Sequence, residues 1–154
     1  MIQAGDRAPE FSAPDQTGKV VRLTDLLANG PVVLFFYPKA MTTGCTKESC
    51  HFRDLAGEFA AVGAQRVGIS ADAVEKQAKF DEKHSLGYPL LSDPDRTIAK
   101  DFGVKRPGPI MNKRATFVIG QDGVLLGTIA SEVNMDKHAD EALALLRGAD
   151  GGAQ

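Results

Sequence analysis

Pro31-Val32-Val33-Leu34-Phe35-Phe36-Tyr37 is a nearly continuous apolar run, and it decides how the rest of the sequence is interpreted. Such a run is typical of a strand that is buried on both faces of a sheet. A loop over 38–44 follows, and a helix is expected over about 43–62, where apolar residues recur at helical spacing: Phe52, Leu55, Phe59 and Val62. A buried strand that leads into a long helix predicts an α/β fold.

The remaining segments extend this pattern along the chain. We expect a hairpin (11–15 and 20–23), a short helix (23–27), a strand (65–70), a helix (73–83), a strand (88–91), a helix from 93–94 to 102–103, two strands (115–120 and 124–130) around the turn Gln121-Asp122-Gly123, and a final helix (135–147) with Gly148 as its C-cap. The order predicts a thioredoxin-like α/β fold, with a central mixed sheet flanked by helices and an N-terminal β-hairpin extension. We expect one domain over 1–147 and a flexible tail over 148–154.

Composition and charge argue against several classes of protein. The 154 residues fit one domain, 43% are hydrophobic, and 18 basic against 20 acidic residues give a formal charge of −2. A nucleic-acid partner is therefore not expected. No apolar run reaches the roughly 20 residues that span a bilayer, and the first residues are too polar for a signal peptide. We expect no membrane partner and a cytoplasmic protein, whose two cysteines are kept reduced.

Cys45 stands at the junction between the buried strand and the long helix. The unpaired N–H groups and partial positive charge of a helix N-terminus favour the thiolate, which is the nucleophilic form. Cys45 shares a helix face with Phe52, so it is expected to point toward the protein body, at the bottom of a shallow pocket. The alternative is an inert buried residue, the commoner fate of a free cysteine. Thr42 is placed either to cap the helix or to reach a ligand above the sulfur.

Cys50 follows five residues after Cys45. On an ideal helix, five residues correspond to about 500° of rotation and ~7.5 Å of rise. The Cα separation therefore exceeds the ~7 Å limit for a disulfide. Either the two thiols never meet, or the first turns of the helix unwind when they do.

A resemblance to a known family rests on this region. Pro38-Lys39-Ala40-Met41-Thr42-Thr43-Gly44-Cys45 matches the P-x-x-x-T-x-x-C signature of peroxiredoxins. Continued to Cys50, the sequence resembles the bacterioferritin comigratory protein, or peroxiredoxin Q, subfamily, in which a second cysteine stands five residues after the first. The resemblance covers roughly residues 5–147 and includes further segments: Phe52-Arg53-Asp54, Val67-Gly68-Ile69-Ser70, Pro89-Leu90-Leu91-Ser92-Asp93 and Arg114-Ala115-Thr116-Phe117-Val118-Ile119. A shorter, proline-rich loop over 105–112 departs from the family and is expected to affect pocket access or reductant docking.

The resemblance implies a thiol-specific peroxidase with a four-residue active site and no cofactor or metal. Cys45 attacks hydrogen peroxide or an organic hydroperoxide and becomes a sulfenic acid. Thr42 holds the peroxide in line, and Pro38 shields the sulfur from water. Arg114 favours the thiolate and stabilises the charge on the leaving oxygen.

The resemblance also implies how the enzyme is regenerated. Cys50 resolves the sulfenic acid as an intramolecular disulfide, which thioredoxin or a similar dithiol then reduces. Glu48 lies about one helical turn after Cys45 and is placed to orient Arg114. A monomer is expected, because the second cysteine belongs to the same chain.

Each residue also has an ordinary structural interpretation. Pro38 ends a strand, Thr42 belongs to a turn, and Arg114 is a surface charge in the basic cluster Lys105, Arg106, Lys113 and Arg114. Glu48 is then an exposed carboxylate that the helix dipole favours. The peroxidase interpretation is preferred because Thr42, Cys45 and Arg114 occur together at the family spacing.

Three other classes of function are weighed against it. A metal-binding protein would use Cys45, Cys50 and His51 with His84 or His138, but this spacing fits no standard zinc pattern. His84 and His138 are instead expected to be exposed helical residues. A dithiol oxidoreductase usually carries C-x-x-C, whereas four residues separate the two cysteines here. A binding module without chemistry does not need Thr42, Cys45 and Arg114 together.

Overall fold

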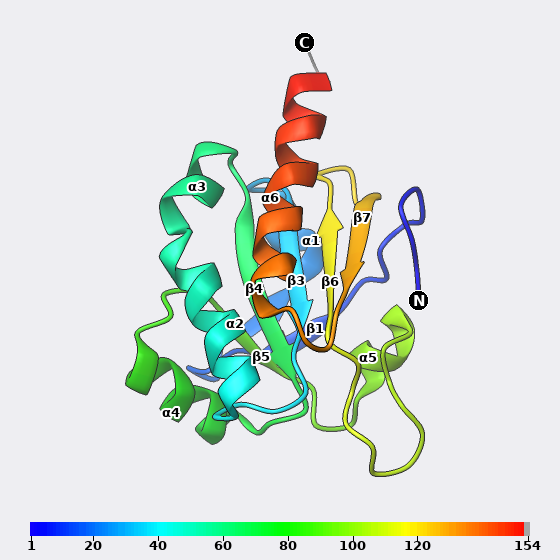
Figure 1. Cartoon of the computed structure of the whole chain (residues 1–154). Helices are drawn as coiled ribbons and strands as arrows, with labels where there is room; N and C mark the ends of the chain where they lie inside the picture. The colour runs from blue at the N-terminus through cyan, green and yellow to red at the C-terminus, as the bar shows by residue number, and fades with distance from the viewer. Residues whose placement is uncertain (153–154) are drawn as a thin grey trace.

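The chain forms a five-stranded mixed sheet with helices on both faces (Figure 1). The computed structural model describes residues 1–152, with side chains as far as Gly148. The strands follow the order β5 (Leu90–Ser92), β4 (Gln65–Ser70), β3 (Val32–Phe36), β6 (Ala115–Ile119) and β7 (Leu125–Ala130). β5, β4 and β3 are parallel, whereas β6 and β7 run antiparallel to their neighbours. The predicted mixed sheet is confirmed.

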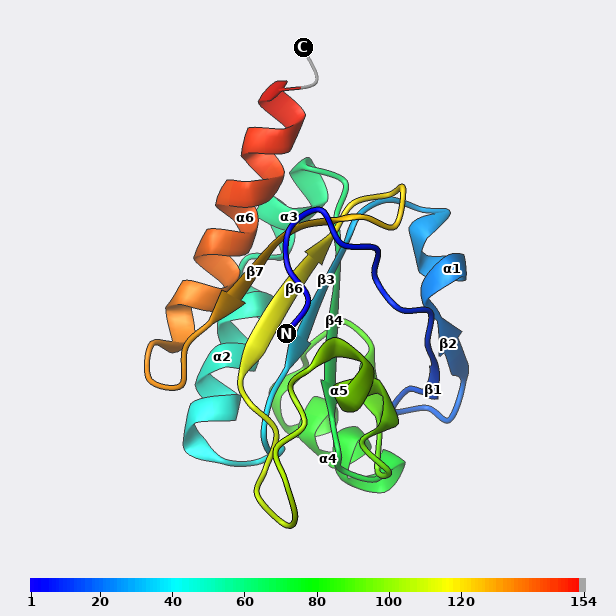
Figure 2. The same cartoon turned by 90° about the vertical axis from the view of Figure 1, so that its right-hand side faces the viewer.

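β3 lies at the centre of the sheet, and its five side chains are all buried. Val32, Leu34 and Phe36 face a core that is covered by α1 (Leu23–Leu27), α5 (Thr97–Phe102) and the hairpin of β1 (Ser12–Pro14) and β2 (Val20–Arg22). Val33 and Phe35 face a second core, covered by α2 (Thr43–Asp54), α3 (Ala56–Ala61), α4 (Val74–His84) and α6 (Met135–Gly152). Figure 2 shows α6 and α2 on one side of the sheet and α1 with the hairpin on the other. The predicted N-terminal hairpin is confirmed.

The long helix predicted over 43–62 is wrong, because the chain forms two helices there. α2 ends at Asp54 and α3 begins at Ala56, with Leu55 between them at φ −94° and ψ 19°. Gly57 lowers the helix propensity at this point. Phe52 still stacks on Phe35, with ring centroids 4.1 Å apart, so the face of α2 that carries Cys45 is fastened to β3.

In three further elements, a boundary differs from the prediction by two residues or more. α5 begins at Thr97 rather than at 93–94, because the Asp93 carboxylate accepts the N–H groups of Ile98 and Ala99 ahead of the helix. β5 covers 90–92 instead of 88–91. α6 continues to Gly152, so Gly148 is not its C-cap and lacks the left-handed geometry of one. The flexibility of 148–154 stays a prediction, and residues 153–154 lie outside the described residues.

Candidate active site

The sheet topology brings Cys45 and Arg114 together although 69 residues separate them. β6 pairs antiparallel with β3, and Ala115 lies opposite Phe36. Arg114 directly precedes β6, so it stands beside the end of β3 where the chain turns into α2. Cys45 is the third residue of α2 and reaches the same place from the other side.

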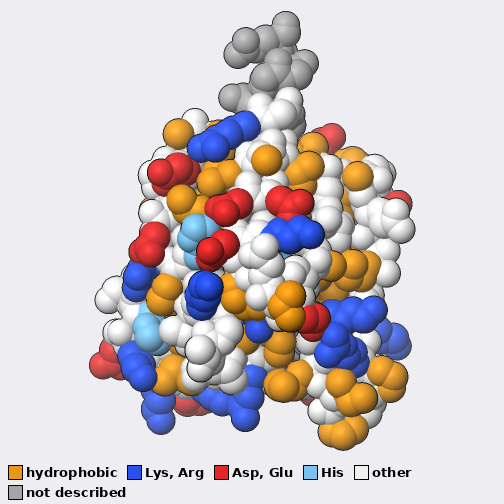
Figure 3. All heavy atoms as spheres, in the orientation of Figure 1, with side chains coloured by type: hydrophobic (Ala, Val, Ile, Leu, Met, Phe, Trp, Pro, Cys, Tyr) orange, Lys and Arg blue, Asp and Glu red, His pale blue; other side chains and the backbone are white. Residues whose placement is uncertain are grey.

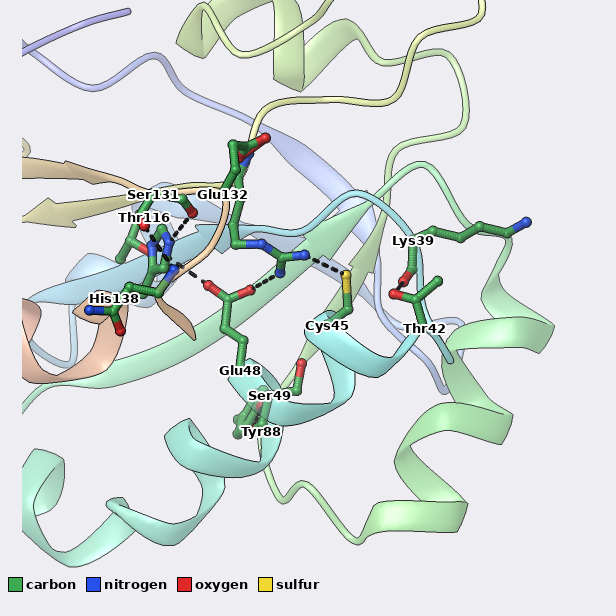
Figure 4. A network of polar contacts seen from close by, with 12 residues as sticks. Lys39, Thr42, Cys45, Glu48, Ser49, Tyr88, Thr116, Ser131, Glu132 and His138 are labelled. Carbon is green, nitrogen blue, oxygen red and sulfur yellow. Dashed lines mark hydrogen bonds and ion pairs between the residues drawn. The ribbon is translucent and has the colours of Figure 1, made fainter. Parts of the chain in front are cut away.

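One guanidinium group connects the thiol to a carboxylate (Figure 4). Nη2 of Arg114 donates a hydrogen bond to Sγ of Cys45 at 3.3 Å, and Nη1 donates to Oε1 of Glu48 at 2.7 Å. Cys45 and Glu48 are 0% exposed and Arg114 is 7% exposed. The interpretation of Glu48 as an exposed carboxylate, and of Arg114 as a surface charge, is therefore wrong. Cys45 points toward the protein body as expected, but the predicted pocket does not open onto its sulfur.

Burial controls the electrostatics of this group of residues. It raises the pKa of Glu48 to about 7, against the opposing effect of Arg114. For Arg114, burial disfavours the charged form, but Glu48 and Cys45 outweigh it and raise the pKa of the guanidinium. Arg114 is therefore a permanent cation, and it is shared between a carboxyl group that changes charge near neutrality and a thiol that becomes an anion when it loses its proton.

The loop before α2 carries the other two predicted residues. Thr42 occupies the N-cap position, but its hydroxyl makes no cap hydrogen bond and donates instead to the Lys39 carbonyl oxygen at 2.8 Å. Its expected capping role is wrong for this reason. Thr42 is exposed and Pro38 is half-buried, both on the loop that leads to Cys45. Their contacts with a peroxide stay predictions.

Cys50 lies on the same intact helix as Cys45. Both are free thiols, and Cys50 is half-buried against the core that contains Phe52. Behind Cys50, the hydroxyl of Tyr88 donates to the Ser49 carbonyl oxygen at 2.6 Å. This contact fastens the middle of α2 to the segment before β5.

Two residues near the site were missed or misplaced by the sequence analysis. Asp72 follows β4, and its Oδ2 accepts the Ala40 N–H at 2.7 Å, which anchors the loop before α2. His138 is 0% exposed, so its predicted exposure is wrong. Its core position has a sequence signal, since the buried residues of α6 recur at helical spacing: Met135, His138, Ala139, Ala142, Leu143 and Leu146. No comparable pattern points to Asp72.

The alternative of a metal site finds no support in the geometry. Among the side chains that the structure describes, which end at residue 148, no three His, Cys, Asp or Glu residues gather closely enough to hold a metal ion. His51 pairs with Asp140 at 2.8 Å, whereas His138 contacts Thr116 and Ser131.

Surface charge and helix hydrophobicity bear on the kinds of partner that the chain could contact. Figure 3 shows acidic and basic side chains interspersed over the face formed by α2 and α6. Arg106, from the basic cluster, pairs with Glu132 at 2.8 Å. Among the described residues, no helix combines the length and apolar character needed to cross a bilayer.

Comparisons with known proteins identify the family of the chain. The model of the AhpC/TSA family matches residues 4–127. The chain is 40% identical over 152 residues to peroxiredoxin Bcp of Escherichia coli, which covers 95% of the chain and 96% of the relative. The crystal structure of peroxidoxin BcpB from Mycobacterium tuberculosis superposes with a TM-score of 0.93 at 58% identity, covering 96% and 98% of the two chains.

A third comparison involves a protein with a described activity. The bacterioferritin comigratory protein of Xanthomonas campestris, whose structures address its alkyl peroxide reduction, gives a TM-score of 0.83 at 29% identity and covers 90% and 91% of the two chains. The family model, the sequence relatives and the shared fold lead to one conclusion: the chain belongs to the AhpC/TSA family of peroxide-reducing thiol enzymes, among the peroxiredoxins of the Bcp and peroxiredoxin Q kind.

Proposed function

We propose that the chain reduces peroxides with Cys45 as the attacking thiolate and Cys50 as the resolving thiol. The observation that carries the proposal is the buried Arg114, which donates to Cys45 Sγ while Glu48 holds its other nitrogen. A fixed cation beside the sulfur favours the thiolate and can stabilise charge that develops on a leaving oxygen. The general activity, reduction of peroxides by a thiol, follows from membership of the family.

The first step transfers one oxygen atom. The Cys45 thiolate attacks the terminal oxygen of the peroxide, the O–O bond breaks, and the leaving alkoxide or hydroxide takes a proton to become alcohol or water. Because the Thr42 hydroxyl gives its hydrogen to Lys39, its lone pairs are free to accept the O–H of an incoming hydroperoxide. Since Cys45 has no exposed surface, the segments that cover it must shift to admit the substrate. Alkyl hydroperoxides are included as substrates by analogy with the Xanthomonas campestris relative.

The second step forms a disulfide and opens the helix. Cys50 attacks the sulfenic sulfur, the new S–S bond forms, and water leaves. Both cysteines lie on α2, where five residues rise by ~7.5 Å, so the N-terminal turns must unwind. The Tyr88 contact to Ser49 favours unwinding on the Cys45 side of that point. Thioredoxin or a similar external dithiol then reduces the disulfide. The cycle needs one chain only, which favours a monomer.

Peroxide consumption by single-cysteine variants tests the proposal. With excess dithiothreitol, Cys45→Ser is expected to lose the catalysed rate, whereas Cys50→Ser keeps the first oxidation step because the Cys45 site is intact. Consumption by Cys45→Ser at the wild-type rate would overturn the assignment.

Hydrogen exchange tests the opening of the helix. After one equivalent of peroxide, amides over 43–50 are expected to exchange faster in the wild type than in Cys50→Ser, which cannot form the disulfide. Equal protection in a confirmed Cys45–Cys50 disulfide form would refute the unwinding step.

A further inference from the structure

A buried imidazole lies behind the Arg114–Glu48 ion pair, and the proposed chemistry does not use it. Nδ1 of His138 stands 3.6 Å from Oε2 of Glu48, the carboxylate oxygen that does not accept from Arg114. That oxygen is buried and has no hydrogen-bond partner among the residues that the structure describes. Figure 4 shows the carboxylate on α2 and the imidazole on α6 facing each other. A buried, unpartnered carboxylate oxygen is costly, so this arrangement requires an explanation.

The hydrogen bonds of His138 determine where its proton lies. Nε2 is 2.9 Å from the Ser131 carbonyl oxygen, which can only accept, so Nε2 carries the hydrogen. In the neutral ring Nδ1 is then an acceptor, and the Thr116 hydroxyl donates to it at 2.8 Å. Nδ1 and an ionised Glu48 therefore oppose each other as two acceptors. One added proton lets the two atoms approach from 3.6 Å and form a hydrogen bond, while the Thr116 hydroxyl rotates away.

The surroundings indicate which of the two groups takes that proton. Burial raises the pKa of Glu48 to about 7 and lowers the pKa of His138. The hydrogen bond to the Ser131 carbonyl oxygen opposes this lowering, as do Glu132 and Glu141, whereas Arg114 lowers the pKa of His138 further. The first proton therefore belongs on Oε2 of Glu48, from which it is donated to Nδ1.

We propose that His138 is a positioning residue of the peroxide site, which shares one proton with Glu48 and thereby sets the charge that Arg114 meets beside Cys45. With the proton bound, Glu48 is neutral and the positive charge of Arg114 acts mainly on Sγ. When the proton leaves to solvent, the Glu48 carboxylate competes with the sulfur for the same guanidinium. The kinetic consequence rests on the proposed peroxidase function, whereas the shared proton does not.

Nitrogen NMR of the histidine rings in the reduced, full-length protein tests the shared proton without any peroxide. Between pH 5 and 9 we expect the Nε2–H tautomer of His138 throughout, and a change in the Nδ1 shift centred within about one pH unit of 7. The change disappears in Glu48→Gln, because it reports the Glu48 proton. An Nδ1–H tautomer, a pH-independent Nδ1 shift, or an imidazolium that forms equally in both proteins would overturn the proposal.

The pH profile of Cys45 oxidation tests the positioning role. His138→Leu leaves no acceptor for the Glu48 O–H, which disfavours the protonated carboxyl group. The profile is expected to contain one transition near neutral pH, which reports the Glu48 proton. In this variant, we expect the midpoint of that transition to fall by about half a pH unit or more. Profiles that superimpose with the wild type would refute the role.

A second variant keeps the test informative if His138→Leu does not fold. Thr116→Val removes the hydroxyl that competes with Glu48 for Nδ1, so the protonated carboxyl group is favoured. The midpoint of the transition near neutral pH is therefore expected to move to higher pH. Thr128→Val, whose hydroxyl bonds to the Ile2 carbonyl oxygen, is the matched control and should leave it in place. A Thr116→Val profile that matches the control contradicts the proposal. If the wild type does not oxidise at all, the proposed function fails, and the NMR titration still decides the shared proton.

Discussion

Replacing Glu48 by glutamine is expected to change the pH dependence of folding stability. Burial raises the pKa of Glu48 from 4.5 to about 7, so the folded state holds this proton more tightly than the unfolded chain. The free energy of unfolding therefore falls as the pH rises from about 4.5 to about 7 and levels off above that range. At about 1.4 kcal/mol per pKa unit, the shift corresponds to about 3 kcal/mol. Glu48→Gln keeps an acceptor for Arg114 and removes this pH dependence of the stability.

Urea unfolding followed by circular dichroism, at pH 5 and pH 8 under reducing conditions, measures the effect. Relative to the wild type, Glu48→Gln is expected to gain about 2–3 kcal/mol on going from pH 5 to pH 8. Glu141→Gln, which removes a half-exposed surface carboxylate, controls for the loss of one charge and should show no comparable gain. A stability difference that is equal at the two pH values, or that changes in the opposite direction, would refute the argument from burial.

Three further substitutions follow from single contacts. Arg114→Lys replaces the two-pronged guanidinium by one ammonium group, which cannot hold Glu48 and Cys45 together. The second-order rate constant of Cys45 oxidation by hydrogen peroxide should therefore fall at least ~10-fold. Arg106→Lys is the control, and equal rate constants in the two variants would count against a role for the Arg114 guanidinium. Asp72→Ala leaves the Ala40 N–H without its acceptor, which loosens the loop and should slow Cys45 oxidation about tenfold. Asp54→Ala, at the exposed end of α2, is the control and should not slow it. Equal rates in the two variants would show that Asp72 does not position the site. Gly30→Ala forces a side chain to a φ of +142° and against the Gly63 carbonyl oxygen, so thermal unfolding should show a loss of roughly 1–3 kcal/mol, and an unchanged midpoint would contradict this backbone argument.

The regular part of the fold was predictable because burial leaves a periodic pattern. The run over 31–37 indicates β3, and the strand predicted over 65–70 has the observed bounds of β4. The break at Leu55 was not predictable, since the apolar spacing continues across it and only Gly57 weakens the helix. The predicted end of α6 is wrong because Gly148, a residue type that often ends helices, has a helical backbone.

The site was only partly readable from the sequence. The position of Cys45 at a helix N-terminus follows from the strand–loop–helix order, whereas the partnership with Arg114 was implied by the family resemblance and explained by the pairing of β3 with β6. The apolar spacing of α6 indicates a buried position for His138, whereas the polar side chain favours an exposed one, and the structure follows the spacing. Asp72 acts through one side-chain hydrogen bond to a loop amide, and such a contact depends on tertiary structure that no local pattern encodes.

The intact mass of the protein after one equivalent of hydrogen peroxide tests the central claim most directly. The reduced wild type is expected to lose two hydrogens, because Cys50 converts the Cys45 sulfenic acid into a disulfide. Cys50→Ser instead gains one oxygen, which peptide mapping should place on Cys45. A wild-type mass that stays unchanged, or an oxygen found on Cys50 while Cys45 remains a thiol, would contradict the account.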